Sequence, residues 1–152
     1  MLDENGLSSA VRWYVDGLAE RSGLHIELNI PADFERLAPE VELAIFRLVQ
    51  ECLTNVHRHS GSKMAIIRIS READKIHVEV QDHGRGMSPE RFAEVRSQGT
   101  GVGIRGMRER VRQVHGELTI ESNALGTRIF ATFPAGTHAE KGEGEIQQLG
   151  VA

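Results

Sequence analysis

The chain has 152 residues, about the length of one domain, and its composition of 39% apolar and 26% charged residues is ordinary for a soluble globular protein. Its formal charge of −4 offers no basic surface for nucleic acid, and no apolar run approaches the roughly 20 residues of a membrane helix. Because the acidic start Met1–Glu4 is not a secretory signal, we expect a cytoplasmic domain without membrane contact, although a full-length protein could be membrane-anchored.

The chain begins with a helical pattern. Apolar residues at helical spacing predict a helix over residues 7–22, with Ser8 or Ser9 available as its cap and a glycine as its stop. Trp13 and Tyr14 are expected to pack this helix.

A strand and a second helix follow. Apolar and polar residues alternate over residues 24–30, which is the pattern of a half-buried strand, and Pro31 ends the run. From Pro39 the apolar spacing is again helical and continues to about His59. Cys52 lies in this helix; as the single cysteine it cannot form an internal disulfide, and we expect a buried, inert thiol.

The remaining chain contains two hairpins separated by helices. The predicted elements are strands at 64–70 and 75–81, a short helix at about 89–95, a helix at about 103–114, and strands at 117–121 and 128–133. Residues 135–152 are predicted to be a flexible tail after a domain of residues 1–134. Strands joined partly by hairpins and partly by helices predict a two-layer α/β (α+β) sandwich, with a mixed sheet of about five strands covered by helices on one face.

Residues 101–106 match the G-x-G-x-x-G pattern of a dinucleotide-binding turn. That motif requires a buried strand leading into it, and residues 89–100 show neither alternation nor an apolar run. We therefore do not interpret the pattern as a Rossmann motif.

Polar residues on the second helix and at a strand end form a candidate site. Glu51 and Asn55 lie one helical turn apart, and His59 continues their row, although such a row by itself is typical of a solvated face. Asn55 offers an oxygen for Mg²⁺, and Asp82 can accept a hydrogen bond from an exocyclic amine of a base. The N-terminus of the helix after Gly103 offers free N–H groups to a polyphosphate.

Four motifs in order resemble those of the GHKL ATPases, the group of gyrase, the heat-shock chaperone, histidine kinases and MutL. Residues 51–60 resemble the N box, Asp82-x-Gly84-x-Gly86 the G1 box, Gly101-x-Gly103 the G2 box, and Gly126-Thr127 the last nucleotide-contacting pair. The phrase at 103–111 is most similar to sensor histidine kinases that pair with LuxR-type response regulators. The resemblance covers about residues 2–134 and implies the Bergerat ATP-binding fold.

The resemblance also implies roles for the phosphate end of the site. Asn55 would be the Mg²⁺ ligand and Glu51 the carboxylate that polarises the attacking group, so these two would be the catalytic residues. Arg58 and His59 would face the phosphates or the nucleoside.

At the base end, the resemblance implies that Asp82 reads the adenine amine and that Thr127 assists through water. His83 stands where the family often has Asn or Asp. The pocket and the hinges of a lid over residues 88–100 would be shaped by Gly84, Gly86, Gly101, Val102 and Gly103.

The implied function is the ATP-binding catalytic domain of a two-component sensor histidine kinase, with ATP and Mg²⁺ as cofactors. Its partners would be a phosphoacceptor-histidine dimerisation hairpin, in the same full-length protein or in trans, and indirectly a response regulator. No such hairpin fits before Leu7, so self-phosphorylation of this chain is not expected.

Two alternatives are an anti-sigma-factor-like serine kinase and an ATP-dependent partner-binding module without phosphotransfer. Retention of Glu51 beside Asn55 favours a kinase, and the Gly106–Arg110 phrase favours a histidine kinase. Arg105, Arg108 and Arg110 are interpreted as helix-surface charges.

Overall fold

The computed structural model describes residues 2–31, 34–60, 62–84 and 102–135. The predicted short helix at 89–95, the predicted lid at 88–100 and residues 136–152 of the predicted tail at 135–152 lie outside the described residues. The domain limit at residue 134 therefore stays a prediction.

The helices and strands follow the predicted order. They are α1 (Leu2–Ser22), β1 (His25–Asn29), α2 (Pro39–Asn55), a π-helical turn (Val56–Ser60), β2 (Met64–Glu72), β3 (Lys75–Asp82), α4 (Val102–Gln113), β4 (Glu117–Asn123) and β5 (Gly126–Pro134).

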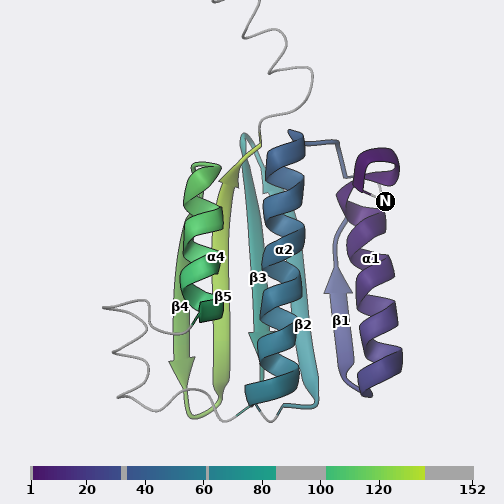
Figure 1. The fold of residues 1–152 in the computed structure, drawn as a ribbon, viewed down its shortest axis with the longest axis vertical. Coiled ribbons are helices and arrows are strands. Elements are labelled where there is room, and N and C mark those ends of the chain that lie inside the picture. Colours follow the sequence, from purple (N-terminus) through teal and green to yellow (C-terminus); the bar gives the residue numbers. More distant parts are fainter. Residues whose placement is uncertain (1, 32–33, 61, 85–101, 136–152) are drawn as a thin grey trace, which may run out of the picture.

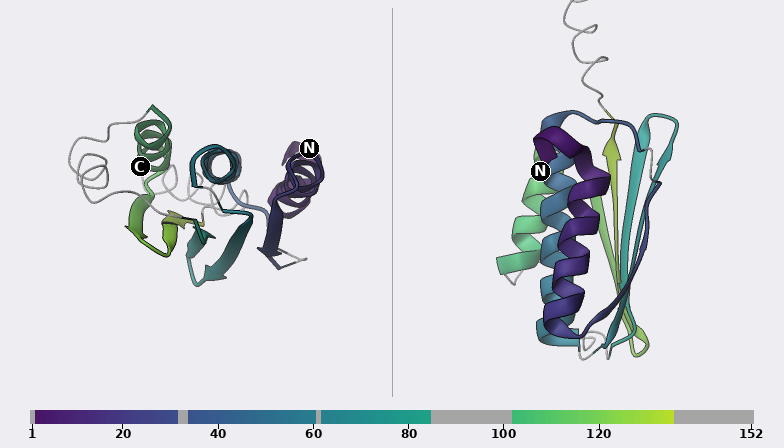
Figure 2. Two further views of the ribbon diagram at one scale, coloured as in Figure 1. Left: turned by 90° about the horizontal axis from the view of Figure 1, so that it is seen from below. Right: turned by 90° about the vertical axis from the view of Figure 1, so that its right-hand side faces the viewer.

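The strands form one five-stranded sheet in the order β1-β2-β3-β5-β4. β1 pairs with β2 in parallel, and the other neighbouring strands are antiparallel. Helices α1, α2 and α4 lie side by side on one face of this sheet (Figures 1 and 2). The predicted two-layer sandwich with a mixed sheet is confirmed.

The core lies between α2 and the middle strands. Alternate residues of β2 and β3 face the helices and are at most 3% exposed: Ala65, Ile67, Ile69, Ile76, Val78 and Val80. The apolar stripe of α2 meets them, and its Ile45, Val49 and Leu53 are fully buried. Because each such side chain contributes about 2 kcal/mol by leaving water, this packing fixes α2 over the sheet.

Helix α1 is interrupted at Gly6, which has φ 79° and ψ −179°, so its regular part begins at Leu7 as predicted. Ser8 does not act as the N-cap; its hydroxyl donates to the carbonyl of Pro31 at 3.4 Å. This contact ties the start of the helix to the end of β1.

The prediction for the aromatic pair on α1 is half right. Tyr14 packs edge-on against Phe46 of α2, with ring centroids 5.9 Å apart. Trp13 is 65% exposed, so its predicted packing is wrong. Trp13 is exposed because it follows the buried Val11 by two positions and therefore lies about 200° around the helix from it.

An ion pair with a buried carboxylate anchors the start of α2. Glu42 is 2% exposed and accepts two hydrogen bonds from Arg36, both at 3.1 Å, and one from the Leu37 N–H at 3.2 Å. A Cβ on Gly6 would lie 2.9 Å from the Arg36 Cδ, so the kink of α1 leaves room for this arginine. No local sequence pattern predicts this pair.

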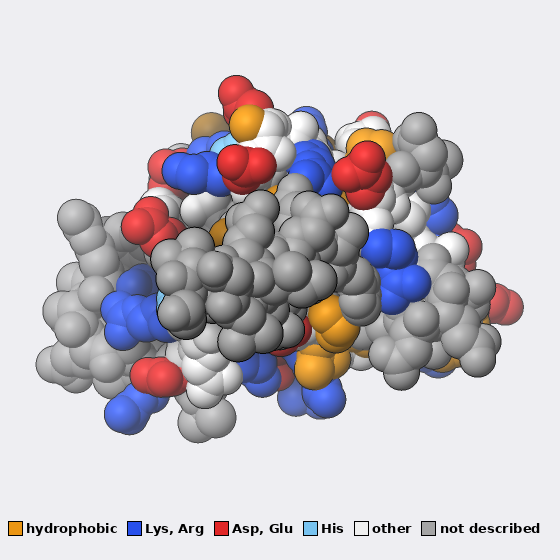
Figure 3. All heavy atoms as spheres, turned by 90° about the horizontal axis from the view of Figure 1, so that it is seen from above, with side chains coloured by type: hydrophobic (Ala, Val, Ile, Leu, Met, Phe, Trp, Pro, Cys, Tyr) orange, Lys and Arg blue, Asp and Glu red, His pale blue; other side chains and the backbone are white. Residues whose placement is uncertain are grey.

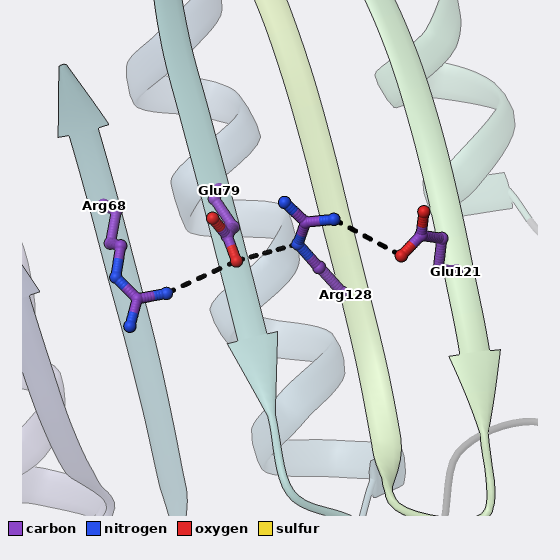
Figure 4. Close-up of polar contacts among 4 residues, drawn as sticks. All are labelled: Arg68, Glu79, Glu121 and Arg128. Carbon is purple, nitrogen blue, oxygen red and sulfur yellow. Dashed lines mark hydrogen bonds and ion pairs between the residues drawn. The ribbon is translucent and has the colours of Figure 1, made fainter.

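The sheet face away from the helices carries a chain of charges. Arg68, Glu79, Arg128 and Glu121 come from β2, β3, β5 and β4, and Glu79 accepts from both arginines, at 3.4 Å from Arg68 and 2.8 Å from Arg128 (Figure 4). Glu121 lies 3.3 Å from Arg128. On the same face, His77 of β3 stacks on Phe130 of β5, with ring centroids 5.8 Å apart.

Charges of both signs also alternate on the described surface at the end of the domain where α2 begins (Figure 3). No helix in the described ranges is long and apolar enough to cross a bilayer.

Candidate functional site

Four segments end or begin at the same end of the sheet, the lower end in Figure 1. They are the C-terminus of α2, the C-terminus of β3, the N-terminus of α4 and the turn between β4 and β5. Asn55 is the last residue of α2 and Asp82 the last residue of β3. The fold therefore brings together the segments that carry the predicted N box, G1 box, end of the G2 box and final Gly-Thr pair.

Asp82 is a buried carboxylate held by two backbone donors. It is 6% exposed, and its Oδ1 accepts from the Gly84 N–H at 2.9 Å and from the Thr127 N–H at 3.2 Å. A buried carboxylate is costly unless such donors compensate it. Within the described residues Oδ2 has no hydrogen-bond partner, so it is available to a ligand donor.

The turn at Gly126 requires a glycine because it passes directly over Asp82. Its φ is 141°, and a Cβ there would lie 2.2 Å from the backbone oxygen of Asp82 and 3.1 Å from its Oδ1. A side chain at this position would displace the backbone that presents the carboxylate. Gly126 thus shapes the site without offering it a functional group.

Thr127 contributes to the same corner in two ways. Its N–H donates to Asp82, and its hydroxyl lies 3.1 Å from that of Ser122 on β4, its cross-strand partner. Ser122 was not predicted, although the two-residue turn at Ala124–Leu125 would have placed it opposite Thr127.

Glu51 and Asn55 are both partly buried near the end of α2, one turn apart as predicted. None of the described residues hydrogen-bonds the Asn55 side chain, so its oxygen can bind an external cation. Helix α2 then widens into the π-helical turn, a rare local geometry that is frequent at functional sites. Arg58 is exposed on this turn, and the side chain of His59 is outside the described part.

Arg110 of α4 faces the catalytic candidate on α2. Its Nη2 lies 3.9 Å from the Glu51 Oε1, and the two side chains are equally exposed, at 37% each. Arg110 was predicted to be a plain surface charge, and its partner was not predicted, because the pair joins two helices whose contact no local pattern indicates.

Cys52, next to Glu51, is buried as expected. Burial, and to a lesser degree the charge of Glu51, raise the pKa of its thiol, which therefore stays protonated.

Several predicted site residues lie outside the described ranges or at their ends. Gly86 and Gly101 lie outside the described residues. Val102 and Gly103 form the first residues of α4, whose N-terminal N–H groups point toward this end of the sheet. His83, beside Asp82, is exposed, and its N–H donates to the Ser62 hydroxyl at 3.3 Å.

The donor set suits Mg²⁺ bound mainly through phosphates. In the described ranges no group of three His, Cys, Asp or Glu side chains is arranged around a common point. Mg²⁺ commonly takes one or two protein oxygens and completes its shell with phosphates and water. The amide oxygen of Asn55, which no described residue hydrogen-bonds, fits that role.

The buried Asp82 at the end of a central strand, Glu51 and Asn55 on the facing helix and the first residues of α4 all lie within a segment that matches a known family of ATPases. Residues 40–137 match the family model described as histidine kinase-, DNA gyrase B- and HSP90-like ATPase. The chain belongs to this family, and Asp82 and Asn55 lie within the matched residues.

Curated relatives are sensor kinases. The chain is 31% identical over 137 residues to the signal transduction histidine-protein kinase/phosphatase DegS of Brevibacillus brevis, and 32% identical over 137 residues to DegS of Bacillus subtilis (strain 168). These alignments cover 90% and 88% of the chain but only 34% and 35% of the relatives. The chain thus spans about a third of the length of these kinases.

A solved structure gives the same result. The histidine kinase domain from the Erythrobacter litoralis EL346 blue-light activated histidine kinase superimposes with a TM-score of 0.72 at 25% identity, over 85% of this chain and 61% of that one. The described chain is therefore the catalytic ATP-binding domain of the sensor histidine kinase type.

Proposed function

We propose that this domain binds MgATP and presents the γ-phosphate to a histidine on a helical dimerisation hairpin, as part of a two-component sensor kinase. The observation that carries the proposal is the convergence of Asp82, held by Thr127 and Gly84, with Glu51 and Asn55 at one end of the sheet. The partners and activity of a whole kinase are inferred from the relatives.

Asp82 is the base-reading residue of the proposal. Its Oδ1 is used by two backbone N–H groups, which leaves Oδ2 to accept from the exocyclic amine of adenine. Since both backbone donors fix the carboxylate, its orientation is set before the nucleotide arrives.

Asn55 and Glu51 act at the phosphate end. Asn55 would hold Mg²⁺ through its amide oxygen, and the metal would neutralise charge on the phosphates. The N-terminus of α4, including Val102 and Gly103, would donate to the phosphates, with Arg58 and His59 nearby. Glu51 would orient the attacking imidazole and accept its proton.

In the cell, the domain would act on the cytoplasmic side, where ATP is present, and the phosphohistidine would pass its phosphoryl group to a response regulator of the LuxR type. The relatives favour this function over a serine kinase. The alternative of an ATP-dependent partner-binding module without phosphotransfer is tested below by measuring transfer to a histidine-bearing hairpin.

The test is calorimetric titration of ATP with and without Mg²⁺. Asp82→Asn should weaken binding about 10- to 100-fold, because it replaces a charge-assisted acceptor. Asn55→Ala should weaken binding only when Mg²⁺ is present. Asn29→Ala, an exposed polar residue of β1, is the matched control and should leave the affinity unchanged.

Transfer is measured with a purified histidine-bearing hairpin from a sensor kinase. Glu51→Gln should keep MgATP affinity and lower phosphohistidine formation about 100-fold or more. Wild-type binding without any transfer would support the partner-binding module, and transfer to serine would support the serine kinase.

A further inference from the structure

The Glu51–Arg110 pair differs from the Arg36–Glu42 pair in the exposure of its carboxylate and in the distance between its charges. In the Arg36–Glu42 pair the carboxylate side chain is only 3% exposed and accepts two hydrogen bonds of 3.1 Å, although the arginine is 39% exposed, and this pair anchors α2. The Glu51–Arg110 pair is 37% exposed on both sides and 3.9 Å long. Such a pair contributes little to folding stability, so stability does not account for it.

The distance leaves Glu51 free to react. At 3.9 Å the contact is an ion pair without a hydrogen bond. Among the described residues neither side chain has another ion pair or hydrogen bond. Both carboxylate oxygens can therefore accept from an attacking group while the opposite charge holds the side chain on the α4 side of α2.

Gly106 allows this placement of the guanidinium. Arg110 follows Gly106 by one helical turn, and helical side chains lean toward the helix N-terminus, here the site end. A Cβ on Gly106 would lie 3.1 Å from the Arg110 Nη2 and 3.8 Å from its Cζ. The guanidinium thus lies directly against α4, over the position that has no side chain.

We propose that Arg110 is a positioning residue for Glu51, which fixes the carboxylate for its part in phosphoryl transfer. The inference rests on the proposed role of Glu51. It also means that α4, whose first residues would contact the phosphates, supplies the charge that orients the carboxylate on α2. A misplacement of about 1 Å in such a group can cost roughly 100-fold in rate.

The test compares Arg110→Gln with Arg112→Gln, an exposed arginine in the last turn of the same helix. Arg110→Gln should lower the single-turnover rate of transfer to the hairpin roughly 10-fold, with MgATP affinity and Tm unchanged. Arg112→Gln should leave the rate unchanged. Arg110→Lys should restore part of it, because it keeps the charge but not the planar fork.

The decisive comparison is the double variant. In a Glu51→Gln background, Arg110→Gln should have no further effect on the rate, since the charge it positions is gone. A loss of the same size in both backgrounds, or no loss in the single variant, would overturn the inference.

A second readout needs neither nucleotide nor transfer. The order parameter of the Glu51 Cγ methylene, measured by ¹³C relaxation, should fall in Arg110→Gln and not in Arg112→Gln. An unchanged order parameter contradicts the positioning role even if the rate falls. Failure of the wild-type chain to bind MgATP would instead contradict the proposed function, so the two failures are distinguishable.

Discussion

Gly126 has no side chain, yet its backbone conformation sets the shape of the candidate site around Asp82. We expect Gly126→Ala to lower the free energy of unfolding by about 2–3 kcal/mol and to weaken ATP binding, because both its φ of 141° and the 2.2 Å approach to Asp82 exclude a Cβ. Gly23→Ala is the control: its φ is 73°, and a Cβ at that position would meet no other atom within 4 Å. That variant should cost about 1 kcal/mol through backbone strain alone and leave ATP binding intact. Equal losses in chemical denaturation would mean that the approach to Asp82 is unimportant.

The predictable site residues were those that a local pattern defines. Asp82 follows from a strand that runs into a glycine turn, and Glu51 with Asn55 from helical spacing. The contacts of Ser122 and Arg110 were not identified, since their partners are set by strand pairing and by helix packing. The roles of the site residues stay predictions.

The elements were predicted well because each has a clear apolar period. The strands over 64–70 and 75–81 are each slightly longer in the structure, as Met64–Glu72 and Lys75–Asp82. The π-helical turn after Asn55 was not predicted, because its apolar and polar pattern does not differ from that of an α-helix.

The ion pair on the buried Glu42 carboxylate at the start of α2 should matter far more to stability than a pair between more exposed side chains. Arg36→Met leaves the Glu42 carboxylate buried without its arginine, while the Leu37 N–H still donates to it, and we expect a loss of about 2–4 kcal/mol in urea unfolding. Combining it with Glu42→Leu should recover much of that loss, because no buried charge remains. Arg68→Gln, which breaks an exposed pair of the open sheet face, should cost less than about 1 kcal/mol. A similar cost for both single variants would argue against a special role of burial.

Binding of MgATP should raise the free energy of unfolding of the whole domain. Saturating MgATP at about 100 times its Kd should add about 2.7 kcal/mol to the free energy of unfolding, provided that only the folded state binds. Differential scanning calorimetry should show a rise in Tm with MgATP that EDTA reduces and that Asp82→Asn largely removes. A Tm that rises equally in Asp82→Asn would place the nucleotide elsewhere.

The order of the strands separates the parts of the domain that can open from those that cannot. Asp82 and Thr127 lie on β3 and β5, which have neighbours on both sides, whereas β1 is a five-residue edge strand bonded only to β2. Edge elements with few bonds are the first to open by local unfolding. Fluctuations that detach β1 can therefore occur while Asp82 and Thr127 keep their contact, so this edge of the sheet can open without disturbing the corner that we propose binds the base.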